Sequence, residues 1–278
     1  MSETAKKTVL TLVIAALVSL ALFKPMDQLG GEYVDSAFKR ALLGFAIARG
    51  LNGVISVAQG TEVAVQPAGV GVNFTPGQIL DPVNDLVERF SWIMLLASSS
   101  LGVQKTLLTI SGWIGLGILV AITAAFFLFT QWTQVVASEA VKRFATQVFI
   151  LLLVLRFIMP LVALANEWFY QQFLAEQYEQ SSEQLENVRD KIGEINDEVM
   201  QDSEVENSSG ALVDRARQLY RSAVKKVDFE RRLEDYKAAA QDLSENAINL
   251  IVVFLMQTVV LPLLFLWAAI TLARRLLR

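Results

Sequence analysis

The residue with the clearest chemical signature is Arg156, which interrupts the apolar run Val148–Leu164. A charge at that depth in a bilayer is costly, so the side chain is expected to face the protein interior or a water-filled cavity. Pro160 follows one turn later and has no N–H to bond the Arg156 carbonyl. Gln257 is a polar residue at a matching depth in the last apolar run. Arg156, Pro160 and Gln257 therefore predict either a pore-lining, anion-attracting site or a buried structural contact.

The structural contact has two candidate partners for the guanidinium. The amide oxygen of Gln257 can accept a hydrogen bond, and the ring of Phe254 can receive a cation–π contact. No carboxylate lies within the four apolar runs, so no ion pair is expected. A third alternative is that Arg156 snorkels toward the cytoplasmic interface.

Residue types exclude several chemistries. The chain has no cysteine and no histidine, which removes thiol and imidazole catalysis and histidine-ligated metals. The acidic residues follow heptad spacing and are expected to be solvated rather than paired in a cleft. We therefore predict a non-enzymatic protein without a cofactor or metal. Nucleic acid is not an expected partner, because the basic stretch has few aromatic residues.

The elements that must position Arg156 are membrane helices. Of 278 residues, 54% are hydrophobic, which is too many for an ordinary soluble domain. Four apolar runs are predicted to span a membrane as helices. They are Thr8–Phe23, Trp113–Thr130, Val148–Leu164 and Leu250–Ile270. The first run is expected to be a retained anchor, with a cleaved signal peptide as the alternative.

Basic residues flanking these runs predict the orientation. Lys6–Lys7, Lys142–Arg143 and Arg274–Arg275 lie on one side if there are four spans, so both termini are expected in the cytoplasm. A fifth span at Phe90–Val103 would place the C-terminal arginines outside, and we do not expect it. This orientation divides the chain into five segments. They are an anchor (1–23), an outer segment (24–111), two spans (112–170), an outer hairpin (171–245) and the last span (246–278).

The outer hairpin is predicted from a repeat of apolar residues at alternating steps of three and four. This is the seam of a coiled coil. The seam residues are Leu185, Val188, Ile192, Ile195 and Val199 on the first arm, and Leu219 and Leu243 on the second. Folding the chain near residue 205 places Leu174 opposite Tyr236 and Ile192 opposite Leu219.

The charges of the two arms differ. The first arm is mainly acidic and the second is rich in lysine and arginine. We interpret the difference as favouring the pairing of the two arms. Recognition of a partner by the acidic tip, Asp202, Glu204 and Glu206, is the alternative.

Smaller features complete the prediction. The outer segment is expected to hold a helix over 33–58, a small β-hairpin turning at Pro67–Gly69, and a helix beginning at Asp81-Pro82. Gly117, Ala121 and Ala125 form a ridge of small residues for helix packing, unless alanine is merely common in spans.

The sequence thus predicts an all-α integral membrane protein with four transmembrane helices, a long antiparallel coiled-coil hairpin outside, and a small β-hairpin. We expect a multi-pass inner-membrane scaffold, assembly or sensory component. Membrane lipid, sister copies and an envelope protein at the hairpin are its expected partners. The alternative function is a homo-oligomeric channel with Arg156 facing the conduction path.

Overall fold

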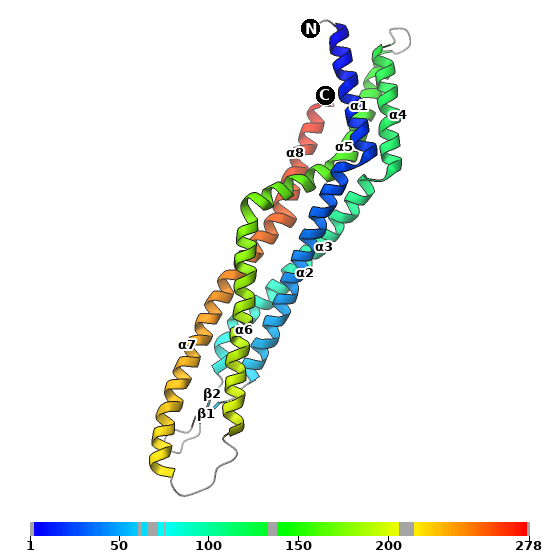
Figure 1. Ribbon diagram of the computed structural model, residues 1–278. Coiled ribbons are helices and arrows are strands. Elements are labelled where there is room, and N and C mark those ends of the chain that lie inside the picture. Colours follow the sequence, from blue (N-terminus) through cyan, green and yellow to red (C-terminus); the bar gives the residue numbers. More distant parts are fainter. Residues whose placement is uncertain are drawn as a thin grey trace. The chain divides into compact units, whose positions relative to one another are not determined.

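The computed structural model describes residues 3–60, 63–65, 72–74, 76–132, 138–205 and 214–276, and it is almost entirely helical (Figure 1). Its α-helices are α1 (Glu3–Phe23), α2 (Pro25–Gly60), α3 (Asp81–Ser111), α4 (Ile114–Trp132), α5 (Glu139–Phe169), α6 (Ala175–Val205), α7 (Asp214–Leu255) and α8 (Leu261–Leu276). Short segments are the 3₁₀-helix η2 (Pro76–Leu80) and the π-helices η3 (Tyr170–Leu174) and η5 (Met256–Val260).

Two short strands accompany the helices. β1 (Val63–Val65) pairs antiparallel with β2 (Val72–Phe74), and Val63 lies opposite Phe74. The turn predicted at Pro67–Gly69 lies outside the described residues.

Within the described residues, six helical segments are long and apolar enough to cross a membrane. They are Glu3–Phe23, Pro25–Gly60, Gln78–Ser111, Ile114–Trp132, Glu139–Glu198 and Glu230–Arg275. The sequence predicted four, because charged residues in α2 and α3 hid their apolar parts. The stretch Phe90–Val103, which we did not expect to be a span, belongs to one of the two additional segments. The chain therefore has the helices of a membrane protein, by length and composition.

The chain forms two compact units. Unit 1 comprises Met1–Arg40, Ala97–Leu174 and Leu255–Arg278, and unit 2 comprises Ala41–Leu96 and Ala175–Phe254. The predicted segments 24–111 and 171–245 both contribute to unit 2. The predicted hairpin over 171–245 is therefore not free-standing.

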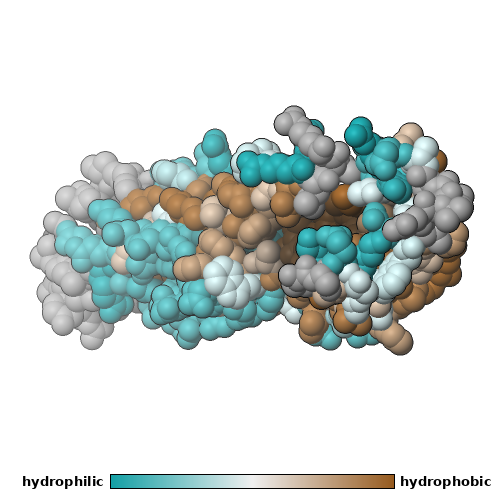
Figure 2. All heavy atoms as spheres, turned by 90° about the horizontal axis from the view of Figure 1, so that it is seen from above, coloured by the Kyte–Doolittle hydropathy of each residue, from teal (hydrophilic) through white to brown (hydrophobic). Residues whose placement is uncertain are grey.

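Unit 1 is built on α1, α4, α5 and α8, which pack along one another. Ile14, Val120, Phe127 and Phe149 belong to its core, and the rings of Phe127 and Phe149 stack with their centroids 5.5 Å apart. Large apolar side chains such as Ile122 (60% exposed) also lie on the outside, where Figure 2 shows hydrophobic residues in brown. Such a surface is typical of a helix bundle in lipid.

The predicted ridge on α4 is shifted from its expected place. Gly117 does lie against α1, since a Cβ there would come within 3.2 Å of the Ala21 carbonyl oxygen. Ala121 is half-buried and Ala125 is exposed, whereas Val120 and Ala124 are buried. Only Gly117 of the predicted three therefore shares the packed face, because the contact with α1 follows Gly117, Val120 and Ala124.

Helices in unit 1 follow one another with short breaks. Lys24, with a φ of 59°, is the one residue between α1 and α2, and α2 continues in the direction of α1 (Figure 1). Gly112 and Trp113 separate α3 from α4, and α4 likewise continues in the direction of α3. Backbone hydrogen bonds join the first residue of each break to the preceding helix: the Lys24 N–H donates to the Leu20 C=O, and the Gly112 N–H donates to the Leu108 C=O.

Unit 2 packs α6 and α7 with the second half of α2 and the first half of α3. Its core includes Leu51, Ile55, Phe90, Leu185 and Leu243, all of them fully buried. Gly44 of α2 lies so close to α3 that an added Cβ would meet the Met94 sulfur at 2.8 Å. This close approach explains why the smallest residue occupies position 44.

Seam residues of the predicted hairpin lie in the core of unit 2. Leu185, Val188, Ile192, Ile195 and Leu243 are buried. The side chains of Val199 and Leu219 lie outside the described part of the structure. The amide nitrogen of Asn196 donates to the Val54 carbonyl at 2.8 Å, so α6 packs against α2 and not against α7 alone.

The register of the two arms differs from the predicted one. The Tyr236 hydroxyl donates to Asn196 Oδ1 at 2.8 Å, and Gln177 Nε2 donates to Asn249 Oδ1 at 3.3 Å. The predicted pairing of Tyr236 with Leu174 is therefore wrong by about three heptads. A shift by whole heptads leaves the same residue types in the seam, so periodicity alone cannot detect it.

Candidate functional site

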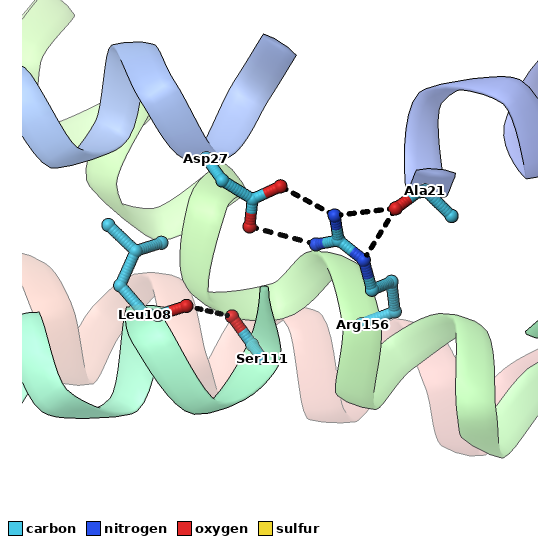
Figure 3. Close-up of polar contacts among 5 residues, drawn as sticks. All are labelled: Ala21, Asp27, Leu108, Ser111 and Arg156. Atoms are coloured by element: carbon cyan, nitrogen blue, oxygen red, sulfur yellow. Dashed lines mark hydrogen bonds and ion pairs between the residues drawn. The ribbon is translucent and has the colours of Figure 1, made fainter. Parts of the chain in front are cut away.

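The most unusual polar group of unit 1 is the guanidinium of Arg156, which has no exposed surface. Its Nε and Nη2 donate to the Ala21 carbonyl at 3.2 and 2.9 Å. Its Nη1 and Nη2 donate to the two carboxylate oxygens of Asp27 at 2.9 and 2.5 Å (Figure 3). The pair with Asp27 is bidentate, the geometry in which arginine binds a carboxylate most strongly. We call this group of Arg156, Ala21 and Asp27 the arginine joint.

The chain presents both acceptors because of the break between α1 and α2. The Ala21 carbonyl would bond the N–H of residue 25, but Pro25 has none. The carbonyl is thus one of the unpaired acceptors at a helix C-terminus, where the helix dipole favours a cation. Asp27 lies in the first turn of α2, on the other side of Lys24. Arg156 therefore fastens the end of one helix to the beginning of the next.

The second helix break of unit 1 lies beside this joint. A Cβ at Gly112 would come within 2.9 Å of Asp27 Oδ1, so only glycine fits there without displacing the carboxylate. In the preceding turn, the Ser111 hydroxyl donates to the Leu108 carbonyl at 3.0 Å (Figure 3). The contact of α5 with the α1–α2 break thus extends to the α3–α4 break.

The predicted partners of Arg156 are not the observed ones. Gln257, 1% exposed, donates from Nε2 to the Tyr33 hydroxyl at 2.9 Å, and its Oε1 has no partner among the described residues. The Phe254 ring packs edge-on against Tyr178, with centroids 5.9 Å apart. The Cζ atom of Arg156 lies 5.4 Å from the centroid of the Phe157 ring. Gln257 and Arg156 therefore belong to different polar contacts.

Asp27 is the residue that sequence reasoning missed. It lies four residues after the first apolar run and was therefore placed outside the membrane. The signal that points to it is the proline at position 25, which ends α1 and leaves its last carbonyls in need of a donor. Arg156 of α5 therefore lies at the level of the C-terminal end of α1 and not at the level of the middle of α1.

Pro160 and Asn166 complete the polar features of α5. Pro160 is buried in the helix one turn after Arg156. Asn166 is fully buried, and neither atom of its amide has a partner among the described residues. Pro160 and Asn166 lie in the second half of α5, which the π-helix η3 follows. Backbone hydrogen bonding therefore departs from the regular α-helical pattern toward the C-terminal end of α5.

The arginine joint has the chemistry of a structural clip. Its guanidinium donates to a carbonyl and a carboxylate of its own chain and has no exposed surface. This geometry favours the structural contact over an arginine that lines a conduction path. Among the described residues, no group of three or more acidic side chains is arranged to bind a metal ion.

Comparison of the chain with protein-family models, curated proteins and solved structures finds no match in any of the three.

Proposed function

We propose that this protein is a non-enzymatic, four-span inner-membrane scaffold or assembly component that binds envelope partners through α6. In this proposal both termini lie in the cytoplasm. Apolar helices anchor the chain in the bilayer, and α6 displays the binding surface outside.

The direction of consecutive helices supports the proposed number of crossings. Two successive crossings of a membrane must run in opposite directions. Because α2 continues in the direction of α1, and α4 in that of α3, each of these pairs supports one crossing. With α5 and α8 the total is four, and the basic residues at Lys6–Lys7, Lys142–Arg143 and Arg274–Arg275 then share one side.

A row of exposed acids on α6 is the observation that carries the proposed binding role. Its members are all exposed and follow one another at steps of three or four. They are Glu176, Glu179, Glu183, Glu186, Asp190 and Glu194. We call this row the acidic face.

The observed register leaves the acidic face without the basic arm that was expected to neutralise it. Gln177 bonds Asn249 and Asn196 bonds Tyr236, so this part of α6 lies beside α7 after Tyr236. Arg231, which precedes Tyr236 on α7, lies further along the arms and reaches Glu198 at 3.9 Å. Asp190 is ion-paired with Arg189 of the same helix at 2.8 Å, and the other five acids form an exposed row of one charge, which favours a partner with basic residues.

We expect reversal of the acidic face to release such a partner. In Glu179→Lys/Glu183→Lys/Glu186→Lys, recovery of a partner cross-linked in intact cells should fall about tenfold, since three solvated charge pairs contribute about 0.5 kcal/mol each. Binding to the unaltered protein should also weaken with added salt. The matched control is Glu234→Lys/Asp242→Lys/Glu245→Lys on α7, which changes the net charge equally on exposed positions. Equal losses in both triple variants would contradict a role for the acidic face.

The orientation is tested separately by chemical labelling. Because the chain has no cysteine, single cysteines give an unambiguous signal. A membrane-impermeant maleimide applied from outside should modify Ser203→Cys and leave Ser138→Cys unmodified. Labelling of Ser138→Cys alone would reverse the proposed topology.

A further inference from the structure

Helix α3 carries two apolar faces, and its own chain covers only one of them. Leu101 is fully buried and Leu108 is 6% exposed, so this face is packed within the protein. On the other face, Val103 is 59% exposed and Ile110 is 61% exposed. Because the first face holds α3 in place, the helix cannot rotate to bury the second.

The exposed face has the spacing of a coiled-coil seam. Its residues alternate steps of four and three and are all exposed. They are Ser99, Val103, Thr106 and Ile110. We call them the open seam. In heptad terms Val103 and Ile110 occupy the a positions, where β-branched residues are found in parallel two-helix pairs, and Ser99 and Thr106 occupy the d positions.

Lipid is a poor cover for the open seam. Lys105 lies between Val103 and Thr106 and forms an ion pair with Asp35 at 2.6 Å, with side chains 57% and 47% exposed. A half-exposed ion pair is costly in the hydrocarbon core, which places this level of α3 in water or among headgroups. Water is a poor cover too, since exposed apolar rows of this kind mark protein contacts.

A second copy of the same helix fits the open seam. The flanking e and g positions are Ser100, Gly102, Leu107 and Thr109. None of them is charged, so two identical helices meet no like charges across the contact. The small residues Ser99, Gly102 and Thr106 allow a close approach. A Cβ added at Gly102 would meet nothing within 4 Å in its own chain. Packing within the chain therefore does not require a glycine at this position.

Copies in one bilayer share one orientation, so a two-fold axis along the membrane normal makes their α3 helices parallel. Each open-seam residue then faces the same residue of the other copy. We propose that the protein is a homodimer formed by parallel pairing of α3 along the open seam. The proposal needs only a fixed membrane orientation, so it does not depend on binding at the acidic face.

Single-cysteine cross-linking in native membranes tests the pairing directly. Ser99→Cys, Val103→Cys, Thr106→Cys and Ile110→Cys should form disulfide-linked dimers on mild oxidation, because facing Cα atoms of a tight helix pair lie about 6 Å apart. Leu101→Cys and Leu108→Cys, on the buried face, should not. Ile122→Cys on α4, 60% exposed, is the control for collision of lipid-facing positions. Dimers at the open seam no more abundant than in these controls would overturn the proposal.

A charge placed in the open seam gives an independent readout. In Val103→Lys, most of the disulfide formed by an added Ile110→Cys should be lost, and the detergent-solubilised particle should fall from twice 30.8 kDa to one chain mass. Gln104→Lys adds the same charge to the same helix beside the seam and should keep the dimer. A dimer that survives Val103→Lys would show that the copies meet elsewhere.

Discussion

Arg156→Glu is expected to destabilise unit 1 by about 3–5 kcal/mol, the cost of leaving a buried charge without its partner. The new carboxylate would face Asp27 and the Ala21 carbonyl, which are both acceptors, in a place where the arginine has no exposed surface. The measurement is thermal unfolding of the detergent-solubilised protein. Arg143→Glu, outside the joint, is the charge-matched control and should unfold close to the parent temperature.

The joint also predicts how a neutral replacement behaves. Arg156→Met would be harmless if no carboxylate were near, as the four apolar runs alone suggest. Because Asp27 is 13% exposed and loses its partner, the single change should instead destabilise. Asp27→Leu/Arg156→Met removes both charges and should recover much of the loss. A single Arg156→Met as stable as the double variant would mean that the ion pair does not form.

Ile192→Asp is expected to disrupt unit 2 by about 3 kcal/mol or more, since it removes a fully buried side chain and buries a carboxylate. Ile192 lies on α6 between Val188 and Ile195, both also buried, so the new charge has no route to water. Limited proteolysis of unit 2 should become much faster, and the protein should lose helical signal at a lower temperature.

The control for Ile192→Asp is two residues away. Glu194→Lys changes charge by a larger amount but lies on the exposed face of α6, so stability should change by less than about 0.5 kcal/mol. Equal protease sensitivity of the two variants would mean that the assignment of inward and outward positions on α6 is wrong.

The arginine joint connects these tests to the way the protein is anchored. α5 carries Arg156 in unit 1, and α6 follows α5 through the π-helix η3. Some variants of the joint will leave the protein folded and only loosen the α1–α2 break. Their effect is best detected in unit 1 itself, by the thermal unfolding measurements above. It should be measured before any effect on partner binding is interpreted.

The sequence by itself determined the helical class and the apolar character of the chain. Apolar runs of sufficient length identify membrane helices, because spacing and composition are local properties. The inward positions of α6 also follow from the local sequence pattern. Leu185, Val188, Ile192 and Ile195 were predicted from a repeat of 3.5 residues and are buried. The polar side of α6 followed from the same repeat.

Only the tertiary structure decided which inward positions meet and what Arg156 binds. The seam repeats every seven residues, so a slip of about three heptads changes the partners without changing the pattern, and Asn196 opposite Tyr236 marks the register that forms. Arg156 and Asp27 are 129 residues apart in sequence. Their contact depends on the Ala21 carbonyl left unpaired by Pro25 and on the packing of α5 against that break. No periodicity of the chain records a contact between such distant positions, which is why the ion pair could be read only from the folded protein.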